Sequence, residues 1–255
     1  MNLIKQKLKS QLTIAYFILL CIEIISESIF INSNNAILLF VTKPLLMPIL
    51  MLWAFLFSKE NSVTPSKILL LALLFSLFGD IFLMLMPFTQ SLFIFGLGSF
   101  LIAHAFYIIL FNKLPHCINT RTSNKNVLML LACLIFGTLL IGFLYVQKSP
   151  AFLSMQIPVI VYACVILTML LSAFSYYQKS QKSGIWILMG ALLFVLSDTT
   201  IALSKFSPIF ADNTILARTI IMSFYGIAQF MIVKGSLLST ISEQNNNDKT
   251  ISQNK

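Results

Sequence analysis

The sequence predicts an all-α membrane protein, a polytopic bundle of about eight transmembrane helices. The composition is 58% hydrophobic and only 10% charged, with 23 Phe in 255 residues and a mean hydropathy of +0.91. Such a chain could not cover itself with polar surface as a soluble globule does. Apolar runs also recur at close to the roughly 20 residues that a helix needs to cross a hydrocarbon core about 30 Å thick. The expected spans are residues 11–31, 36–57, 67–87, 91–111, 127–147, 152–175, 184–205 and 214–238.

The spans are expected to be helical, because backbone polar groups in lipid must be satisfied within their own segment. The runs also lack the short alternating pattern of an outer-membrane barrel strand. The linkers are short, so no soluble domain fits between them. The sequence therefore predicts one transmembrane domain over residues 1–238. The polar, Asn-rich tail from 239 to 255 is expected to be disordered.

The distribution of basic residues predicts the orientation. If the N-terminus is cytoplasmic, thirteen of the 17 Lys and Arg residues fall in cytoplasmic regions. They are Lys5, Lys7, Lys9, Lys59, Lys67, Lys113, Arg121, Lys125, Lys179, Lys182, Lys234, Lys249 and Lys255. The outer loops keep Lys148 and, at a helix end, Lys205, while Lys43 and Arg218 lie within spans. The positive-inside rule therefore predicts that both termini are cytoplasmic. Topology and anionic lipid then account for the net charge of +9, without a nucleic-acid partner.

The first span carries two glutamates. A basic start followed by an apolar run resembles a secretory signal, but Glu23 and Glu27 interrupt the run and no small-x-small cleavage site follows it. We therefore expect an uncleaved helix. The two side chains are four residues apart and share one helix face. They are expected either to form buried ion pairs or to reach the outer interface, and a sharper hypothesis places Glu23 in the same cavity as Asp80.

The second span contains a lysine followed by two prolines. Lys43 lies about seven residues below the outer end of the span, and Pro44 and Pro48 follow it. Proline removes backbone donors and can kink the helix, which would open the bundle where a ligand enters. Two compatible roles are open for Lys43: counter-ion to Glu23 or an aspartate, and ligand of a lipid phosphate.

The third and fourth spans carry a carboxylate and an imidazole. Asp80 precedes the outer turn at Pro87 by seven residues, or roughly 10 Å of helix. A charged side chain in hydrocarbon is costly, so it usually faces a bundle interior or a wet cavity. Gly79 beside it allows a neighbouring helix or a substrate to approach closely. His104 and Tyr107 share a face about two turns deeper. His104 is expected to be either a hydrogen-bonded core histidine or a catalytic group.

The second half of the chain provides a second acid. Asp198 lies seven residues before Lys205, at about the depth of Asp80. A shift of 118 residues lays Asp80 on Asp198 and also Tyr107 on Tyr225. This pattern predicts a weak two-fold repeat of two four-helix halves.

The intramembrane charges are expected to form one layer. Glu23 and Lys43 lie with the two aspartates roughly 10 Å below the outer edge, the depth of a lipid's glycerol region. The sixth span adds Tyr162, and the eighth adds Arg218 near its outer end. Two carboxyl groups that are close in low dielectric cannot both ionise cheaply, so one is expected to keep its proton near neutral pH. We therefore expect both aspartates in one cavity, as general acid and general base.

No metal and no other cofactor is expected. The four cysteines have no metal-ligand spacing and three of them lie within spans, which argues against zinc and disulfides. They are Cys21, Cys117, Cys133 and Cys164. The sequence has neither a G-x-S-x-G elbow nor an H-E-x-x-H helix, which argues against a serine hydrolase or a zinc protease of the usual pattern.

Four segments together resemble a known family. KPLLMPILML, FSLFGDIFLML, FGLGSFLIAHAFYI and GALLFVLSDTTIAL are similar, in this order, to successive motifs of the YhhN/TMEM86 family of multi-pass membrane proteins. The resemblance covers nearly the whole chain. It implies an eight-helix bundle that hydrolyses the vinyl ether bond of lysoplasmalogens, giving a fatty aldehyde and glycerophosphocholine or glycerophosphoethanolamine. The two motif aspartates of the family fall on Asp80 and Asp198, whereas Glu23 and Glu27 have no place in its pattern.

The chemistry of vinyl ethers suits these residues. Such ethers are protonated at the carbon beta to oxygen, water captures the oxocarbenium ion, and the hemiacetal collapses. Our hypothesis is that one aspartic acid delivers the proton while the other stabilises the cation and activates the water. Asp80 is taken as the ionised partner, because Lys43 is expected near it. The candidates to orient the water or the ether oxygen are His104, Tyr107, Tyr162 and Tyr225, and those to hold the phosphate are Lys43 and Arg218.

Two other classes of protein stay open. A proton-coupled transporter of a small molecule or lipid also has intramembrane acids, a basic partner, prolines and a repeat. A lipid-binding or scaffold protein without turnover would use the same charges as structural ion pairs. The expected partners are a lysophospholipid substrate and the bilayer, with no protein partner. The Asn- and Lys-rich termini are typical of a bacterial protein, for which the plasma (inner) membrane is the expected location.

Overall fold

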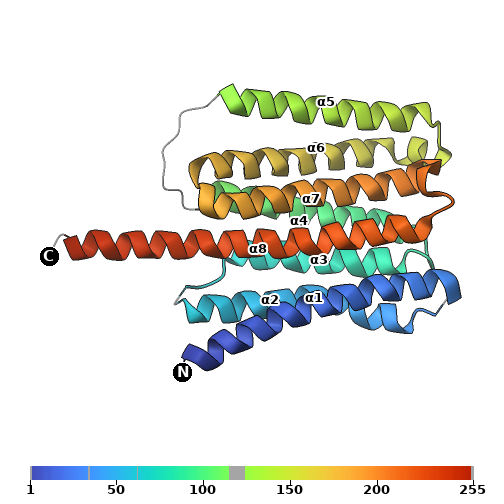
Figure 1. Ribbon diagram of the computed structural model, residues 1–255. Coiled ribbons are helices and arrows are strands. Elements are labelled where there is room, and N and C mark those ends of the chain that lie inside the picture. Colours follow the sequence, from blue (N-terminus) through green and yellow to red (C-terminus); the bar gives the residue numbers. More distant parts are fainter. Residues whose placement is uncertain (1, 34, 62, 115–123, 254–255) are drawn as a thin grey trace.

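The computed structural model describes residues 2–33, 35–61, 63–114 and 124–253 (Figure 1). Within these ranges the chain forms eight α-helices, one 3-10 turn and no strand. They are α1 (Asn2–Ser33), α2 (Ile37–Glu60), α3 (Lys67–Leu85), α4 (Leu92–Lys113), α5 (Asn124–Val146), α6 (Pro150–Lys179), α7 (Gln181–Phe206), η1 (Pro208–Phe210) and α8 (Thr214–Gln253). Each of the eight described α-helices is long and apolar enough to cross a membrane. The predicted all-α, eight-span fold is confirmed, and the chain is an integral, multi-pass membrane protein.

Some helices extend beyond the spans that composition predicts. α8 continues past residue 238 to Gln253, so this part of the tail is helical where we expected disorder. A helix that is already nucleated propagates at one hydrogen bond per added residue, so it can outlast its apolar run. Three residues named in the sequence analysis, Cys117, Arg121 and Lys255, lie outside the described ranges.

Successive helices alternate in direction, which creates two faces of the bundle. α1 begins and α8 ends at one face, which we call the terminal face (Figure 1). The α1–α2, α3–α4, α5–α6 and α7–α8 connections lie at the opposite face, which we call the distal face. Which face meets the cytoplasm stays a prediction, as does the internal repeat.

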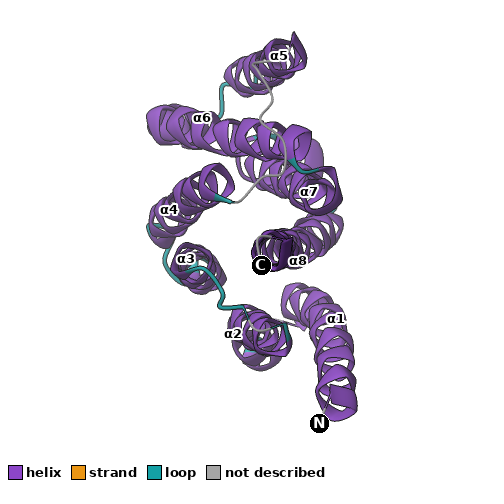
Figure 2. Cartoon of the chain, turned by 90° about the vertical axis from the view of Figure 1, so that its left-hand side faces the viewer, coloured by secondary structure: helices purple, strands orange, loops and turns teal. Residues whose placement is uncertain are grey.

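The end view shows how the helices surround one another (Figure 2). α8 lies between α7 and α1 and also packs against α2, while α4 packs against both α3 and α6. α5 lies at the outer edge, where it packs against α6. Most exposed large side chains are aliphatic or aromatic, as expected for a surface that meets lipid.

Buried tyrosine and tryptophan side chains join α1, α2 and α8. The hydroxyl of Tyr16 donates to the carbonyl oxygen of Gly226 at 2.8 Å, and the indole N–H of Trp53 donates to the hydroxyl of Thr13 at 2.9 Å. The ring of Phe230 packs against both, with centroids 5.8 Å from Tyr16 and 5.0 Å from Trp53. Each polar tip thus has a partner inside the bundle, as a dry core requires.

The charged residues of the predicted layer lie near the distal ends of their helices. Lys43, Asp80 and Asp198 are between five and eight residues from those ends. Both aspartates and Lys43 point into the bundle, where their side chains are almost fully buried. The fold therefore positions three intramembrane charges at similar depth on α2, α3 and α7.

Candidate functional site

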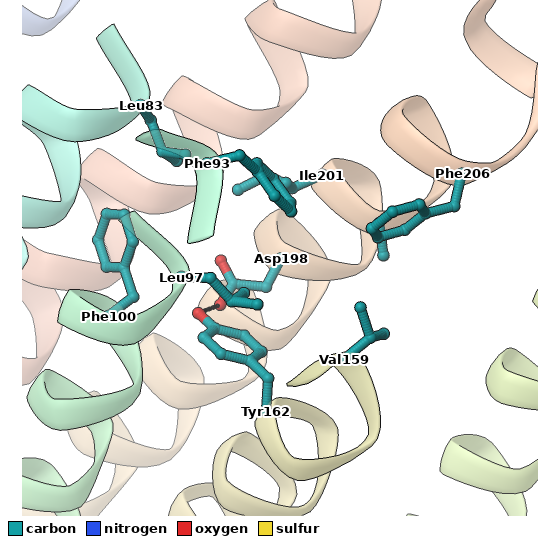
Figure 3. Close-up of a pocket in the computed structure, with 10 residues that line it drawn as sticks. Leu83, Phe93, Leu97, Phe100, Val159, Tyr162, Asp198, Ile201 and Phe206 are labelled. Carbon is teal, nitrogen blue, oxygen red and sulfur yellow. Dashed lines mark hydrogen bonds between the residues drawn. The ribbon is translucent and has the colours of Figure 1, made fainter. Parts of the chain in front are cut away.

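Asp198 on α7 is held by a tyrosine of the neighbouring helix. The hydroxyl of Tyr162 on α6 donates a hydrogen bond to Oδ2 of Asp198 (Figure 3). His104 of α4 is fully buried, and its Nε2 lies 3.8 Å from the same oxygen. The His104 ring packs edge-on against Tyr162, with centroids 5.4 Å apart. The structure therefore brings three of the predicted site residues together from α4, α6 and α7.

A small apolar cavity of about 40 Å³ lies over Asp198 and Tyr162 (Figure 3). Its polar lining comes from these two side chains, and the rest of the wall is apolar. The apolar lining residues are Leu83, Phe93, Leu97, Phe100, Val159, Ile201, Ala202 and Phe206. We call this space the Asp198 cavity. Asp198 and Tyr162 are therefore the polar groups that a molecule in this cavity would meet.

Asp80 on α3 has a different partner. Its Oδ2 accepts a hydrogen bond of 2.7 Å from the hydroxyl of Tyr225 on α8, and the residue is only 2% exposed. The preceding Gly79 faces the ring of Phe100, and a Cβ atom at position 79 would lie 2.6 Å from that ring. As the sequence analysis expected, the glycine allows close packing, but a phenylalanine of the next helix fills the space.

The two aspartates do not meet in the Asp198 cavity, because aromatic rings lie between them. Phe100 lines that cavity and packs edge-on against Tyr225 at 5.7 Å, while Asp80 is not among the lining residues. Phe194 packs against Tyr225 at 5.4 Å and against His104 at 4.6 Å. The spacing of the two aspartates along the sequence could not predict this separation. Spacing indicates how deep each residue lies in the membrane, but it does not indicate which aromatic rings fill the interior.

Tyr107 belongs to a buried network rather than to the Asp198 cavity. Its hydroxyl donates to Oε1 of Gln229 on α8, and the Gln229 amide donates to Ser76 of α3 at 3.0 Å. The three side chains join α3, α4 and α8 through satisfied hydrogen bonds. Tyr107 is therefore positioned to stabilise the bundle, although the sequence analysis proposed it as a supporting site residue.

The remaining predicted charges form an ion cluster near the distal face. Nζ of Lys43 lies 2.6 Å from Oε1 of Glu27 and 3.8 Å from Oε1 of Glu23. The guanidinium of Arg218 pairs with the other oxygen of Glu27. The carboxyl oxygens of Glu23 accept no direct hydrogen bond from the residues that the structure describes. The expectation of buried ion pairs is thus confirmed for Glu27, which the sequence analysis left without a role in the site.

A second cavity of about 200 Å³ opens beside this cluster. Lys43, Lys205 and Arg218 line it together with Glu27, so cations outnumber anions among its charged lining residues. We call it the charged cavity. Sequence reasoning placed Lys205 at a helix end and did not propose it for the site. The only signal was its position seven residues beyond Asp198 on the same helix.

The charged cavity and the Asp198 cavity adjoin. They share Leu83 of α3, Phe93 of α4 and Ile201 of α7 as lining residues. Nζ of Lys205 also lies 5.2 Å from the centroid of the shared Phe93 ring. Cationic groups near the distal face and an acid in an apolar cavity below them therefore lie on either side of a shared wall. This arrangement suits an amphiphile with an anionic head.

Comparison with known proteins identifies the family of this chain. The model of the YhhN family matches residues 38–236. The chain is a member of the YhhN family. It is similar to the human (Homo sapiens) lysoplasmalogenase TMEM86A, with 31% identity over 201 residues, which are 76% of each chain. The bovine (Bos taurus) lysoplasmalogenase TMEM86A is 32% identical over 201 residues, again 76% of each chain. No solved structure matches it.

The resemblance noted from the motifs is thus confirmed for this YhhN family member. The matched range includes Lys43, Asp80 and Asp198, whereas Glu23 and Glu27 lie before it. The ion cluster therefore pairs Lys43 and Arg218, which lie in the range that matches the family, with glutamates that precede this range.

Proposed function

We propose that this protein is a hydrolase that cleaves the vinyl ether bond of lysoplasmalogens to a fatty aldehyde and a glycerophospho-base. Family membership and the names of its relatives support this class. The observation that carries the proposal is the adjoining pair of cavities, one cationic and one apolar with Asp198 in its wall. A lysophospholipid requires these two environments side by side, one for its phosphate and one for its hydrocarbon chain.

The depth of the acid fits the substrate. Asp198 is seven residues, or roughly 10 Å of helix, from Lys205 on α7. If Lys43, Lys205 and Arg218 hold the phosphate, the glycerol unit extends from the charged cavity towards Asp198. The vinyl ether, which follows the glycerol, then lies beside the acid.

In the proposed reaction, the carboxylic acid of Asp198 gives its proton to the alkene carbon beta to the ether oxygen. The π electrons form the new C–H bond and leave an oxocarbenium ion beside the Asp198 carboxylate. Water adds to the cation and gives a proton back to that carboxylate, so the acid is regenerated. The hemiacetal then loses the glycerol oxygen as an alcohol while the aldehyde C=O forms. Tyr162 positions Asp198 throughout.

Asp80 is proposed as the charged partner of this reaction. The ring of Phe100 lies between Asp80 and the Asp198 cavity. The Asp80 carboxylate would therefore stabilise the oxocarbenium ion through space rather than by contact. Two charges that are separated by one aromatic ring still interact where water is excluded, because the surrounding medium screens them weakly. His104, beside Asp198, is proposed to keep the acid in place together with Tyr162.

Aldehyde release from purified protein and lysoplasmalogen tests this function. Replacing the general acid in Asp198→Asn is expected to lower the rate about 10²- to 10⁴-fold. Asp80→Asn is expected to lower it less, because its action is indirect. Asp212→Asn, at an exposed aspartate of the η1–α8 connection, is the matched control and should retain the rate. A folded Asp198→Asn variant with full activity would refute the scheme. Acid-dependent solute uptake without aldehyde would instead favour the transporter.

A further inference from the structure

A long apolar groove runs along the contact between α5 and α6. It has a volume of about 540 Å³ and is lined by residues of these two helices from Leu130 to Tyr145 and from Ile160 to Leu171. α5 lies at the outer edge of the bundle (Figures 1 and 2). Exposed side chains of the groove are therefore expected to face the surrounding lipid. Leu130 and Leu134 on its rim are 43% and 56% exposed.

A third small cavity, also of about 40 Å³, connects this groove to the candidate site. It shares Val159, Tyr162, Asp198 and Ala202 with the Asp198 cavity. The Asp198 cavity and this connecting cavity therefore lie next to each other at Asp198.

The same connecting cavity also borders the groove where α5 packs against α6. The two have Gly137 and Ile141 of α5 and Ala163 and Leu167 of α6 in common. Four neighbouring spaces thus follow one another from the charged cavity near the distal face, past Asp198, to the α5–α6 groove, and each shares wall residues with the next. We call this succession the track.

Glycines of α5 keep the groove open. Gly142 lines the groove, and a Cβ atom added there would meet no heavy atom within 4 Å, so a side chain at this position has open space. At Gly137 a Cβ atom would lie 2.9 Å from Cδ1 of Leu167, where the connecting cavity meets the groove. A larger side chain at either position would reduce the free volume of the track.

We propose that the α5–α6 groove binds the hydrocarbon chain of the lysophospholipid substrate and sets the chain length that the protein accepts. This inference rests on the proposed function. With the phosphate in the charged cavity and the vinyl ether at Asp198, the chain must leave the Asp198 cavity on its other side. That cavity holds about 40 Å³, too little for a long chain, and the apolar groove lies beyond the connecting cavity on that side.

The direction of the track agrees with the arrangement of a lipid in a bilayer. From Tyr145 to Leu130 the groove follows α5 away from the distal face for roughly 22 Å. A lysolipid in the leaflet at the distal face has its head at that face and its chain pointing the same way. The substrate can therefore enter sideways from the leaflet, with its chain passing between α5 and α6.

Narrowing the groove tests the proposal. Gly142→Phe places a ring in the empty part of the groove, and Gly98→Phe on α4 is the matched control, because a Cβ atom there also meets nothing within 4 Å. Aldehyde release is compared for lysoplasmalogens with long and short alkenyl chains. Gly142→Phe is expected to lower the ratio of aldehyde release from long-chain substrates to that from short-chain substrates about tenfold or more. The reason is that a smaller groove excludes a long chain more strongly than a short one. An unchanged ratio, or an equal change in Gly98→Phe, would overturn the proposal.

Photolabelling tests the groove without relying on turnover. The probe is a lysophospholipid with an uncleavable alkyl ether chain that carries a diazirine at its end. We expect labelling in residues 130–145 and 160–171, competed by excess unlabelled alkyl lysophospholipid and lost in Gly142→Phe. Labelling elsewhere, or labelling that Gly142→Phe leaves intact, would overturn the groove proposal. Wild-type protein that releases no aldehyde from any chain length would refute the hydrolase instead, and the labelled positions would still decide where the chain binds.

Discussion

Tyr162 on α6 donates its hydroxyl hydrogen to the carboxyl group of Asp198 on α7, and both side chains line two adjoining cavities. The pair thus lies where a lipid would pass from the charged cavity towards the α5–α6 groove. Under the proposed function, the Asp198 carboxyl group would contact the middle of the lysophospholipid, where the glycerol joins the chain.

Removing the Tyr162 hydroxyl should impair turnover. Tyr162→Phe leaves the Asp198 carboxyl group without its donor, and the loss of one such bond in a buried site corresponds to about 1–3 kcal/mol. We expect aldehyde release to fall roughly ten- to a hundredfold. The control is Tyr16→Phe, which removes another buried tyrosine hydroxyl, bonded to Gly226 on the opposite side of α8. Equal losses in the two variants, measured per folded molecule, would contradict a specific role for Tyr162.

The ion cluster predicts coupling between Lys43 and Glu23. Lys43→Met leaves Glu27 paired with Arg218, but it removes the cation that lies 3.8 Å from Glu23. An uncompensated buried charge destabilises a protein by about 3–5 kcal/mol, so the melting temperature in detergent should fall. Adding Glu23→Gln should restore part of the loss. A double variant that is as unstable as the sum of the two single variants would show that these side chains are not coupled.

Lys205 should affect substrate binding more than chemistry. Its ammonium group lines the charged cavity, whereas Asp198 lies about two turns away. Lys205→Gln is expected to raise KM roughly ten- to a hundredfold and to leave kcat nearly unchanged, because a lost charge-assisted contact weakens binding by about 1.5–3 kcal/mol. Lys148→Gln is the control, since Lys148 is an exposed lysine in the α5–α6 connection. A fall in kcat with constant KM would contradict the assignment.

The packing of α7 against α8 depends on a glycine. A Cβ atom at Gly235 would lie 2.7 Å from Cγ1 of Ile187 and 3.0 Å from the Ser183 carbonyl oxygen. Gly235→Ala should therefore destabilise the bundle by about 1–3 kcal/mol, since backbone cannot yield as a side chain does. Gly98→Ala has open space and should be neutral or more stable by up to about 1 kcal/mol. The melting temperatures of the two variants are measured by thermal unfolding in detergent. Equal melting temperatures would contradict the packing argument.

The orientation predicted from the basic residues can be measured directly. We expect the terminal face to be cytoplasmic, because most Lys and Arg residues lie there. In a background without native cysteines, Lys148→Cys should react with a membrane-impermeant maleimide added outside intact cells. Lys182→Cys should react only after the cells are opened. Both positions are exposed, so the reverse pattern would show that the distal face is cytoplasmic.

Much of the fold could be predicted from local sequence. A span is recognised from the hydropathy of its own twenty or so residues, so each of the eight helices could be found without knowledge of its neighbours. The depth of Asp80, Asp198 and Lys43 followed in the same way, by counting residues from a helix end. The motifs also identified the family that the comparison confirmed.

The partners of these residues could not be predicted in this way. Contacts between residues far apart in the chain depend on how each helix rotates about its axis and which side chains fill the space between. Phe100, whose ring covers Gly79, separates Asp80 from the Asp198 cavity, although both acids have the expected depth. Only the tertiary structure shows that Lys205 joins the charged cavity.

The sequence by itself therefore determined the membrane class, the eight spans, the depth of the intramembrane charges and the family. These properties depend on the composition and spacing of single segments. The tertiary structure decided which charges meet, which acid faces a cavity and where an apolar groove continues from it. The physical reason is that helix packing is governed by the shapes of side chains on several helices at once, and no single segment contains that information.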